Sequence, residues 1–569
     1  MKTMTKSQPL RVSMLILASI LFCGMPLLAR DSSPQPMLSY ATAVGAGGVS
    51  SLPLSRQDSV HFASQVRRLP KQRFAHVTDT ADQRGRAPSG EFSLIYHVLG
   101  LGIGFPDYSV FGQPPNPTLA VGDTEVIQSA FGVYADFDKS TGAIIPLDGQ
   151  DFTLGNTIWR NLLPGTLCAN SNSDNGQLIV RFDRAAHRWI VAQNVFTSPY
   201  AVCLAISETA MFSDNVWYAY QFSVVQSGFP DYPKWGVWST GGVSDGYFQT
   251  WNNFGPGGSG FVGPVMCGYD RAKLLVGDGT AEQICFQLTA NENSLLPADR
   301  DSPVGPPATE DEFFIGSVAA VDNSHLSVYS MHIDNWQSGD ATMTGLNNSQ
   351  LIAVAPYNGS CSGNYGGDCV PQEGTSAKLD SLGDRLMYRF AYWDDRPSAN
   401  VTSTPPIPPP LQHWLVNFDV ESPTGQIGVR WFEFIANQRT VPVTLLSVFQ
   451  QGTYEGSPSD TNYRWMGSMA RDDVQDIVVG YSISSPSMFP SIAAAGRKYT
   501  DPLGVLSPEQ FSVNGTGSQG SSPWGEYSTM EIDPSDNCTF FYTTEYYMFT
   551  VPANNWSTDI SSWKFPSCH

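Results

Sequence analysis

The sequence predicts an all-β protein, and a β-propeller, most simply one of seven blades, is the expected architecture. Charged residues make up 15% of the 569 residues and aromatic residues 12%, with 52 Gly and 41 Pro. Low charge with frequent aromatic and turn-forming residues is typical of short strands joined by tight turns. Similar hairpins recur along the chain, which indicates a radial arrangement of sheets.

The clearest hairpin lies within residues 524–547, WGEYSTMEIDPSDNCTFFYTTEYY. Its first strand is expected at 528–532, its turn at 533–537 and its second strand at 538–547, because Asp, Pro and Asn favour turns whereas aromatic and β-branched residues favour strands. The same plan, an apolar strand, an Asp-containing turn and a second apolar strand, recurs upstream. The units centre near residues 123, 183, 270, 322, 384, 473 and 533.

Seven units at these intervals fit four-stranded blades with loops of variable length, although six or eight blades also fit. A pair of β-sandwiches in tandem is the alternative architecture. A propeller must close its ring, so strands near both ends of the blade region, at 92–99 and 539–549, are expected to share one blade.

The first 90 residues differ from the rest of the chain. Residues 1–29 combine basic side chains, an apolar run at 14–22 and a small residue at Ala29, which is the layout of a cleaved secretory signal. Residues 30–90 lack sustained alternation and are expected to be a flexible leader or pro-segment. The propeller domain is assigned to 91–569, and no later stretch is long and apolar enough to cross a membrane.

Cysteine usage and net charge restrict the environment and the partners. Removal of the signal leaves eight cysteines, and an even count in an exported chain predicts disulfides. We expect them to pair as sequence neighbours, although eight cysteines allow 105 connectivities: Cys168 with Cys203, Cys267 with Cys285, Cys361 with Cys369, and Cys538 with Cys568. The net charge of −21 argues against nucleic acid as a partner. We therefore expect an extracytoplasmic protein, periplasmic or extracellular.

No cofactor signature is present. The Asx-rich stretch 170–176 spaces its oxygen ligands as calcium loops do, with Asp174 as the candidate ligand, but it lacks the Gly and the closing Glu of that pattern. An ordinary Asx-rich turn is the favoured explanation.

The densest mixture of aromatic and polar residues is 229–251, FPDYPKWGVWSTGGVSDGYFQTW. Asp231, Lys234 and Asp245 lie there among rings such as Trp235. Sugar rings stack on aromatic faces while their hydroxyl groups bond to carboxylates, so this segment is a candidate carbohydrate site. The alternative is that the rings fill a core between blades and that Asp231 belongs to a turn.

A second candidate group is cationic. Arg385 and Arg389 lie four residues apart, and this spacing places both on one face of a strand. With Arg464 and Arg497 they are expected to point into a central funnel and to bind a carboxylate. Partner acids and a tyrosine nucleophile are expected among Glu433, Glu526, Tyr527, Glu545 and Tyr546, because tyrosine nucleophiles occur in sialidases. The alternative for each Arg is an ion pair with an Asp of a neighbouring blade.

Long motifs carry a resemblance to a known group: FPDYPKWGVW (229–238), QEGTSAKLDSLGDRLMYRFAYW (372–393), VRWFEF (429–434), RWMGSMA (464–470), DIVVGYSIS (476–484), FPSIAAAGR (489–497), DPLG (501–504) and the hairpin at 524–547. Over roughly residues 110–568 the chain resembles a family of large secreted bacterial propeller proteins, which has no assigned activity. The resemblance implies the fold and export. A looser resemblance to sialidase-like propellers rests on the arginines and the Asp turns, but the chain lacks a clean S-x-D-x-G-x-x-W box.

These observations leave three hypotheses. The first is an enzyme acting on extracellular glycans, a sialidase-like glycoside hydrolase with Glu545, Tyr527 and Asp231 as catalytic candidates. The arginines, Lys234, Asp245 and Trp235 would then bind substrate. The second is a non-catalytic propeller that binds polysaccharide or a surface protein. The third, a secreted peptidase or other hydrolase, rests on the export signal alone.

Overall fold

Antiparallel strands make up nearly all the regular structure of the computed structural model. It describes residues 34–50, 67, 69, 74, 76–83, 92–110, 112–170, 176–225, 228–318, 322–346, 350–361, 367–383, 385–396, 412–436, 441–456, 459–550 and 555–569. The expected signal peptide and the calcium candidate Asp174 lie outside these residues. The described residues from Pro34 to His569 form one compact unit. The all-β prediction is confirmed.

Within the described residues, seven antiparallel meanders follow one another along the chain. Meander 1 contains β4 (Thr118–Val121), β5 (Glu125–Ala130), β6 (Val133–Asp138) and β7 (Thr153–Leu154). Meander 2 contains β8 (Leu178–Asp183), β9 (Arg188–Val195), β10 (Ala201–Ser207) and β11 (Val216–Ser223). Meander 3 contains β12 (Phe229–Trp238), β13 (Gly246–Gly255), β14 (Ser259–Asp270) and β15 (Glu282–Gln287). Meander 4 contains β16 (Asn293–Arg300), β17 (Glu312–Ser317), β18 (His325–Asn335) and β19 (Asp340–Gly345).

The remaining meanders lie in the C-terminal half. Meander 5 contains β24 (Leu386–Asp394), β25 (Gln412–Glu421), β26 (Ile427–Ala436) and β27 (Leu446–Tyr454). Meander 6 contains β28 (Tyr463–Arg471), β29 (Ile477–Ser485), β30 (Met488–Arg497) and β31 (Gln510–Val513). Meander 7 contains β32 (Thr529–Ile532), β33 (Phe540–Tyr546) and β34 (Ser557–Lys564), completed by β3 (Ser93–Gly102).

Short elements decorate this framework. Four short strands are β20 (Leu351–Ala353), β21 (Asn358–Gly359), β22 (Asp368–Val370) and β23 (Leu379–Asp380). The helical turns are α1 (Thr157–Leu162), η2 (Phe212–Asp214), η4 (Pro256–Gly258) and α2 (Arg271–Leu274). No helix in the described part of the chain is long and apolar enough to span a membrane.

The first strands of the meanders form one continuous series of contacts. β4 contacts β8, and the contacts continue through β12, β16, β24, β28 and β32, which contacts β4 again. Between β16 and β24 the contact is a parallel ladder that joins meanders 4 and 5 into one sheet. Large apolar side chains fill the spaces between meanders, as where Trp238 packs edge-on against Tyr392. The first strands are therefore the common centre of the core.

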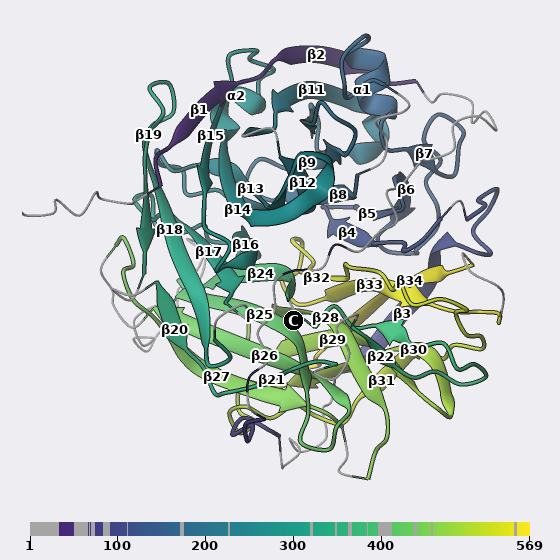
Figure 1. Ribbon diagram of the computed structural model, residues 1–569. Coiled ribbons are helices and arrows are strands. Elements are labelled where there is room, and N and C mark those ends of the chain that lie inside the picture. The colour runs from purple at the N-terminus through teal and green to yellow at the C-terminus, as the bar shows by residue number, and fades with distance from the viewer. Residues whose placement is uncertain are drawn as a thin grey trace, which may run out of the picture. The chain divides into compact units, whose positions relative to one another are not determined.

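Strands from both ends of the blade region share meander 7. β3 pairs with β34 in an antiparallel register from Ser93 opposite Lys564 to Gly102 opposite Ser557, and Figure 1 shows the two strands side by side. This pairing matches the sharing of one sheet that the sequence predicts for 92–99 and the C-terminal hairpin.

The leader contains ordered strands. Its β1 (Met37–Tyr40) pairs with β15, and its β2 (Ala43–Gly48) pairs with β11, so each adds a fifth strand to a meander. Further on, Asp79 forms a buried ion pair with Arg430 of β26 at 2.7 Å. These short strands pair with the edge strands of sheets whose other strands come much later in the chain. Sustained alternation of apolar and polar residues is therefore not needed to form them.

The Asp-containing turns form as expected, although not all at the same place in a meander. The carboxylates of Asp183, Asp472 and Asp533 accept hydrogen bonds from backbone N–H groups two residues later, and each turn joins the first and second strands of its meander. Asp322 caps the turn between the second and third strands of meander 4, and Asp270 starts α2. Sequence spacing alone therefore does not reveal which pair of strands a turn joins.

All four disulfides join the cysteine pairs that the sequence predicts. Cys267 and Cys285 lie opposite each other on β14 and β15, and Cys538 is joined to Cys568, which ties the last residues to meander 7. Four disulfides are typical of proteins that fold in an oxidising compartment outside the cytoplasm.

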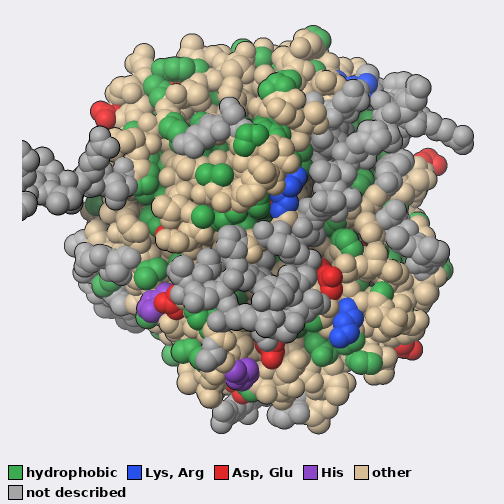
Figure 2. All heavy atoms as spheres, in the orientation of Figure 1, with side chains coloured by type: hydrophobic (Ala, Val, Ile, Leu, Met, Phe, Trp, Pro, Cys, Tyr) green, Lys and Arg blue, Asp and Glu red, His purple; other side chains and the backbone are tan. Residues whose placement is uncertain are grey.

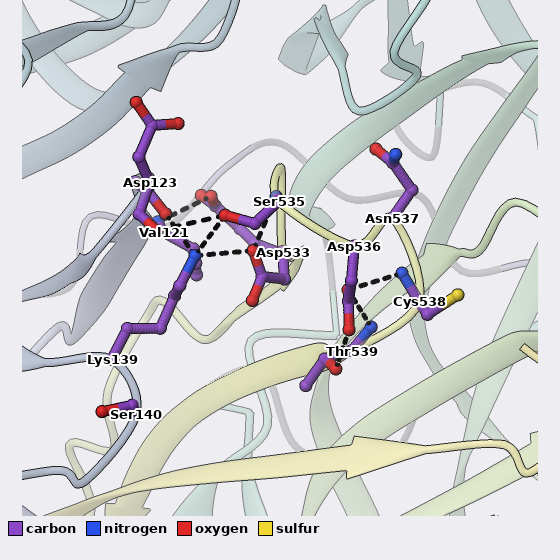
Figure 3. Close-up of polar contacts among 12 residues, drawn as sticks. Val121, Asp123, Lys139, Ser140, Asp533, Ser535, Asp536, Asn537, Cys538 and Thr539 are labelled. Atoms are coloured by element: carbon purple, nitrogen blue, oxygen red, sulfur yellow. Dashed lines mark hydrogen bonds and ion pairs between the residues drawn. The ribbon is translucent and has the colours of Figure 1, made fainter. Parts of the chain in front are cut away.

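Lys139 connects meanders 1 and 7. Its ammonium group donates to the carboxylate of Asp533 at 2.7 Å, to the hydroxyl of Ser535 at 2.7 Å and to the carbonyl of Gly122 at 2.9 Å (Figure 3). Ser535 donates in turn to the carbonyl of Asp123 at 3.1 Å. The Lys139 and Asp533 side chains are 12% and 11% exposed. If one partner is lost, water therefore has little access to hydrogen-bond the other.

We predict that Lys139→Met lowers the free energy of unfolding by about 1–3 kcal/mol, because it leaves Asp533 with one charge partner fewer in a mostly buried setting. Lys564→Met is the matched control, since Lys564 pairs with Asp536 at a more exposed site. We expect the control to cost less than about 1 kcal/mol. Urea unfolding measures both values, and equal losses would contradict the proposed role of Lys139.

Candidate functional site

Three distant segments meet at the beginnings of first strands. Asp231 and Lys234 lie in β12, Arg385 precedes β24, and Glu526 and Tyr527 precede β32. The hydroxyl of Tyr527 donates to the carbonyl of Pro233 at 2.7 Å, which joins the last of these segments to β12. Sequence analysis named all five of these residues as candidates. We call them, with the rings of Tyr232 and Tyr388, the β12–β24–β32 cluster.

A bulge in β12 presents the first of these residues. The register between β12 and β13 shifts between Asp231 and Lys234, and Tyr232 within the bulge has a φ of 56°. Left-handed backbone is strained for a bulky residue and persists where surrounding contacts hold it. The hydroxyl of Tyr232 donates to the carbonyl of Leu386 at 3.1 Å, and the Arg385 guanidinium lies 4.9 Å from the Tyr232 ring centroid. The bulge therefore joins β12 to the start of β24.

Aromatic faces surround the Lys234 ammonium group. Its nitrogen lies 2.9 Å from the ring centroid of Tyr527, 3.4 Å from that of Tyr232 and 5.6 Å from that of Tyr388. Burial lowers the pKa of Lys234 well below its ordinary value, and Glu526 and Asp231 oppose this effect by stabilising the charged form. Ring faces therefore surround the Lys234 ammonium group, and the charges of two nearby carboxyl groups favour its protonated form.

Cations oppose the effect of burial on the pKa of both carboxyl groups: Arg385 and Lys234 act on each, and Arg67 acts in addition on Asp231. Burial raises the pKa of Glu526 to about 7, and the nearby charge of Asp231 adds to the rise. Burial also raises the pKa of Asp231, but Arg385, Arg67 and Lys234 all act against that rise. Glu526 is accordingly the group suited to carry a proton near neutral pH, with Asp231 as the carboxylate beside it.

Tyr527 is not activated as a nucleophile in this arrangement. Its hydroxyl is engaged with the Pro233 carbonyl, and burial raises the pKa of Tyr527 well above its ordinary value. An attacking phenolate requires the opposite shift. The structure therefore places Tyr527 in the cluster as an aromatic wall rather than in the expected nucleophilic role.

The other arginines do not join Arg385. Arg389 is fully buried and donates to Asp299 at 2.7 Å, to Asp301, and to the carbonyl of Met530 at 2.7 Å. Its register with β25 shifts between Met387 and Ala391, so a spacing of four no longer keeps Arg385 and Arg389 on one face.

Arg464 and Arg497 also have local partners. Arg464 donates to both oxygens of Glu509 at 2.8 Å and pairs with Asp460. Arg497 donates to the carbonyl of Asp501 at 2.8 Å. The expected funnel of four arginines is therefore not assembled, and a neighbouring acid or carbonyl explains each of these side chains.

Three further candidates lie apart from the cluster or serve the core. Glu545 accepts from the backbone N–H of Gly525 at 2.7 Å, and burial raises its pKa well above the ordinary range. Asp245 pairs with Arg271 at 2.8 Å. Trp235 is buried and stacks on Tyr269 with ring centroids 5.1 Å apart. Trp235 thus follows the alternative of a core aromatic residue.

Sequence reasoning missed two contributors to the cluster. Tyr388 lies between the two predicted arginines, but strand patterning does not show which ring covers Lys234. Arg67 belongs to the leader, where no periodicity marks it; its carbonyl accepts from Arg385 at 2.9 Å. Only the folded contacts bring Tyr388 close to Lys234 and Arg67 close to Arg385.

The described surface carries no group suited to a metal. Among the described residues, no group of three or more His, Cys, Asp or Glu side chains is arranged to hold one. In the face drawn in Figure 2, the coloured Lys and Arg side chains are isolated among hydrophobic and uncharged atoms.

Comparison with known proteins adds little. No protein-family model matches the chain, and no curated protein matches its sequence significantly. Several solved structures show distant likeness. A Hadza microbial sialidase has 7% identity and a TM-score of 0.34 over 92% of this chain and 100% of that one. The Penicillium chrysogenum α-L-arabinanase has 9% identity and a TM-score of 0.27 over 60% and 94%. The catalytic domain of a Coprinopsis cinerea GH62 α-L-arabinofuranosidase has 8% identity and a TM-score of 0.25 over 69% and 92%. Likeness at this level does not establish a shared activity.

We predict that Glu526→Gln changes how stability depends on pH. A carboxyl whose folded pKa is raised stabilises the fold below its unfolded pKa and loses that contribution as pH rises through the folded pKa. For Glu526 this window runs from about 4.5 to about 7. The wild type should therefore lose about 1–3 kcal/mol relative to Glu526→Gln between pH 4.5 and pH 8. Urea unfolding at both pH values measures the difference.

Asp214→Asn serves as the control because Asp214 is exposed in η2. Its stability should follow the wild type at both pH values. A constant gap between wild type and Glu526→Gln across this range would show that Glu526 does not titrate as described.

Proposed function

We propose that the seven meanders are the blades of one β-propeller in an exported protein. The series of contacts that begins and ends at β4, and the sharing of meander 7 by β3 and β34, support a ring rather than two separate sandwiches. The four disulfides and the signal-like residues 1–29 support a periplasmic or extracellular location.

We further propose that the protein hydrolyses glycosidic bonds of an extracellular glycan at the β12–β24–β32 cluster. The observation that carries this proposal is the meeting of Asp231 and Glu526, two carboxyl groups from distant meanders, with a pKa of about 7 for Glu526. Glycosidases use a pair of carboxyl groups of which one is protonated near neutral pH.

In the proposed reaction, Glu526 donates its proton to the glycosidic oxygen as the bond to the anomeric carbon breaks. The Asp231 carboxylate takes a proton from the water that attacks this carbon, so the water supplies the new hydroxyl group. Proton exchange with solvent then restores both groups. Arg385 would bind a carboxylate on the sugar, since guanidinium groups bind carboxylates through paired hydrogen bonds. An acidic glycan is therefore the preferred substrate class.

The second candidate function is non-catalytic binding of a polysaccharide or a surface protein. The near-complete burial of Asp231 and Glu526, 8% and 6% exposed, favours it because an active site must admit a substrate. Binding without turnover that persists in Asp231→Asn would support this alternative.

We predict that Glu526→Gln and Asp231→Asn each lower kcat/KM by at least about 100-fold on an aryl glycoside that the wild type cleaves. The wild-type kcat/KM should fall above about pH 7, as Glu526 loses its proton. A panel of neutral and acidic aryl glycosides identifies the substrate.

Glu312→Gln is the matched control, because Glu312 of β17 is also a buried carboxyl and the residues that act on its pKa do not belong to the cluster. This variant should keep most of the activity. If no member of the panel is cleaved, or if Glu312→Gln is as impaired as Glu526→Gln, the hydrolase proposal fails.

A further inference from the structure

Arg67 of the leader contacts the β12–β24–β32 cluster, and Leu69 packs with Phe229, two residues before Asp231. The carbonyl oxygen of Arg67 accepts from a terminal nitrogen of Arg385 at 2.9 Å. Arg67 also acts on Asp231, because its charge opposes the effect of burial on the pKa of that carboxyl. Arg67 thus contacts the cation of the cluster through its backbone and lies close enough to one of the carboxyl groups to influence it.

Side-chain contacts hold Arg67 and Leu69 in place. The Arg67 guanidinium lies 3.9 Å from the ring centroid of Phe229, at the start of β12, and donates to the carbonyl of Gly258 at 3.2 Å. Leu69 is buried in a small apolar group with Phe196, Phe229 and Phe254. Gly258 permits the close approach, since a Cβ there would lie 2.1 Å from an Arg67 nitrogen.

The leader is attached to the fold on both sides of these residues. β1 and β2 extend meanders 3 and 2 before Arg67, and the ion pair of Asp79 with Arg430 follows Leu69. The attachment keeps Arg67 and Leu69 at a high effective concentration beside Arg385, even though their own contacts are few.

We propose that Arg67 and Leu69 form an intramolecular plug, which occupies the ligand position beside Arg385 and must leave before a glycan binds. The Arg67 carbonyl takes the place of an oxygen of the ligand, and Leu69 covers the apolar platform of Phe229 and Phe254. The inference rests on the proposed function for the nature of the ligand, whereas the occlusion itself rests on the contacts of Arg67 and Leu69.

The test measures access to Arg385 without relying on activity. The folded wild type, Arg67→Ser/Leu69→Ser and the matched leader variant Gln83→Ser are treated with phenylglyoxal, which modifies accessible arginines, and Arg385 and Arg464 are followed by peptide mass spectrometry. Gln83 is suited as a control because it bonds to Leu506 away from the cluster. Arg464 serves as an internal control for partial unfolding of the whole fold, since it is bound to Glu509 and not to the cluster.

We expect Arg385 to react about tenfold faster or more in the double variant, because the plug loses its side-chain anchors, with Arg464 unchanged and Gln83→Ser like the wild type. Leu69→Ser alone should give a smaller increase in the same direction, and it decides the question if the double variant does not fold. An unchanged Arg385 rate, or an equal increase at Arg464, overturns the plug.

The same variants separate this inference from the proposed function. If Arg385 is modified faster in the double variant and aryl glycoside hydrolysis rises, the plug and the hydrolase proposal are both supported. If Arg385 is modified faster but no glycoside of the panel is cleaved, the plug is supported and the hydrolase proposal fails.

Discussion

The fold depends on buried charge pairs that join first strands from different meanders. Asp299 of β16 accepts from two arginines, Arg181 of β8 and Arg389 of β24, and Arg181 also donates to Glu531 of β32. Four first strands are thus joined through one group of hydrogen-bonded charges. Isolated charges in such a position would be very costly, whereas removal of one partner of a buried pair leaves the other uncompensated. The relative order and register of these strands is therefore tightly specified at the centre, and surface loops are free to vary in length.

This requirement explains why charged residues are so unevenly used. Arg389 lies only four residues from Arg385, but its guanidinium is bonded to Asp299 of β16 and to the carbonyl of Met530 in β32. It is therefore unavailable to a ligand. The β12–β24–β32 cluster lies where first strands begin, and there the match of charges is looser. Lys234 has ring faces as its nearest neighbours, and Asp231 and Glu526, whose pKa values are raised, share Lys234 and Arg385 as cationic neighbours. Imperfectly matched titratable groups of this kind are where ligand chemistry is expected in a protein.

The sequence predicts the local features of this structure far better than the long-range ones. The four disulfides, the Asp turns and the pairing of β3 with β34 follow from cysteine spacing, turn chemistry and the need to close a sheet. Of the ten residues proposed to be catalytic or to bind substrate, Asp231, Lys234, Arg385 and Tyr527 do come together. Arg389 does not join them because strand periodicity assumes an unbroken ladder, and the register shift in β24 changes which side chains share a face. Arg464, Arg497 and Asp245 instead have local partners, which strand periodicity does not predict. No pattern in one sequence predicts such bulges, or that a leader without alternation would supply Arg67.

The leader also affects the chemistry of the cluster that it covers. Arg67, Lys234 and Arg385 all act on Asp231, whereas Lys234 and Arg385 act on Glu526. Departure of Arg67 removes one of the charges that hold down the pKa of Asp231. The pKa of Asp231 would then rise, unless water enters to solvate its carboxylate. The plug and a bound ligand therefore exclude each other, since each places an oxygen acceptor on Arg385. A segment that competes in this way affects the charge state of the site as well as access to it.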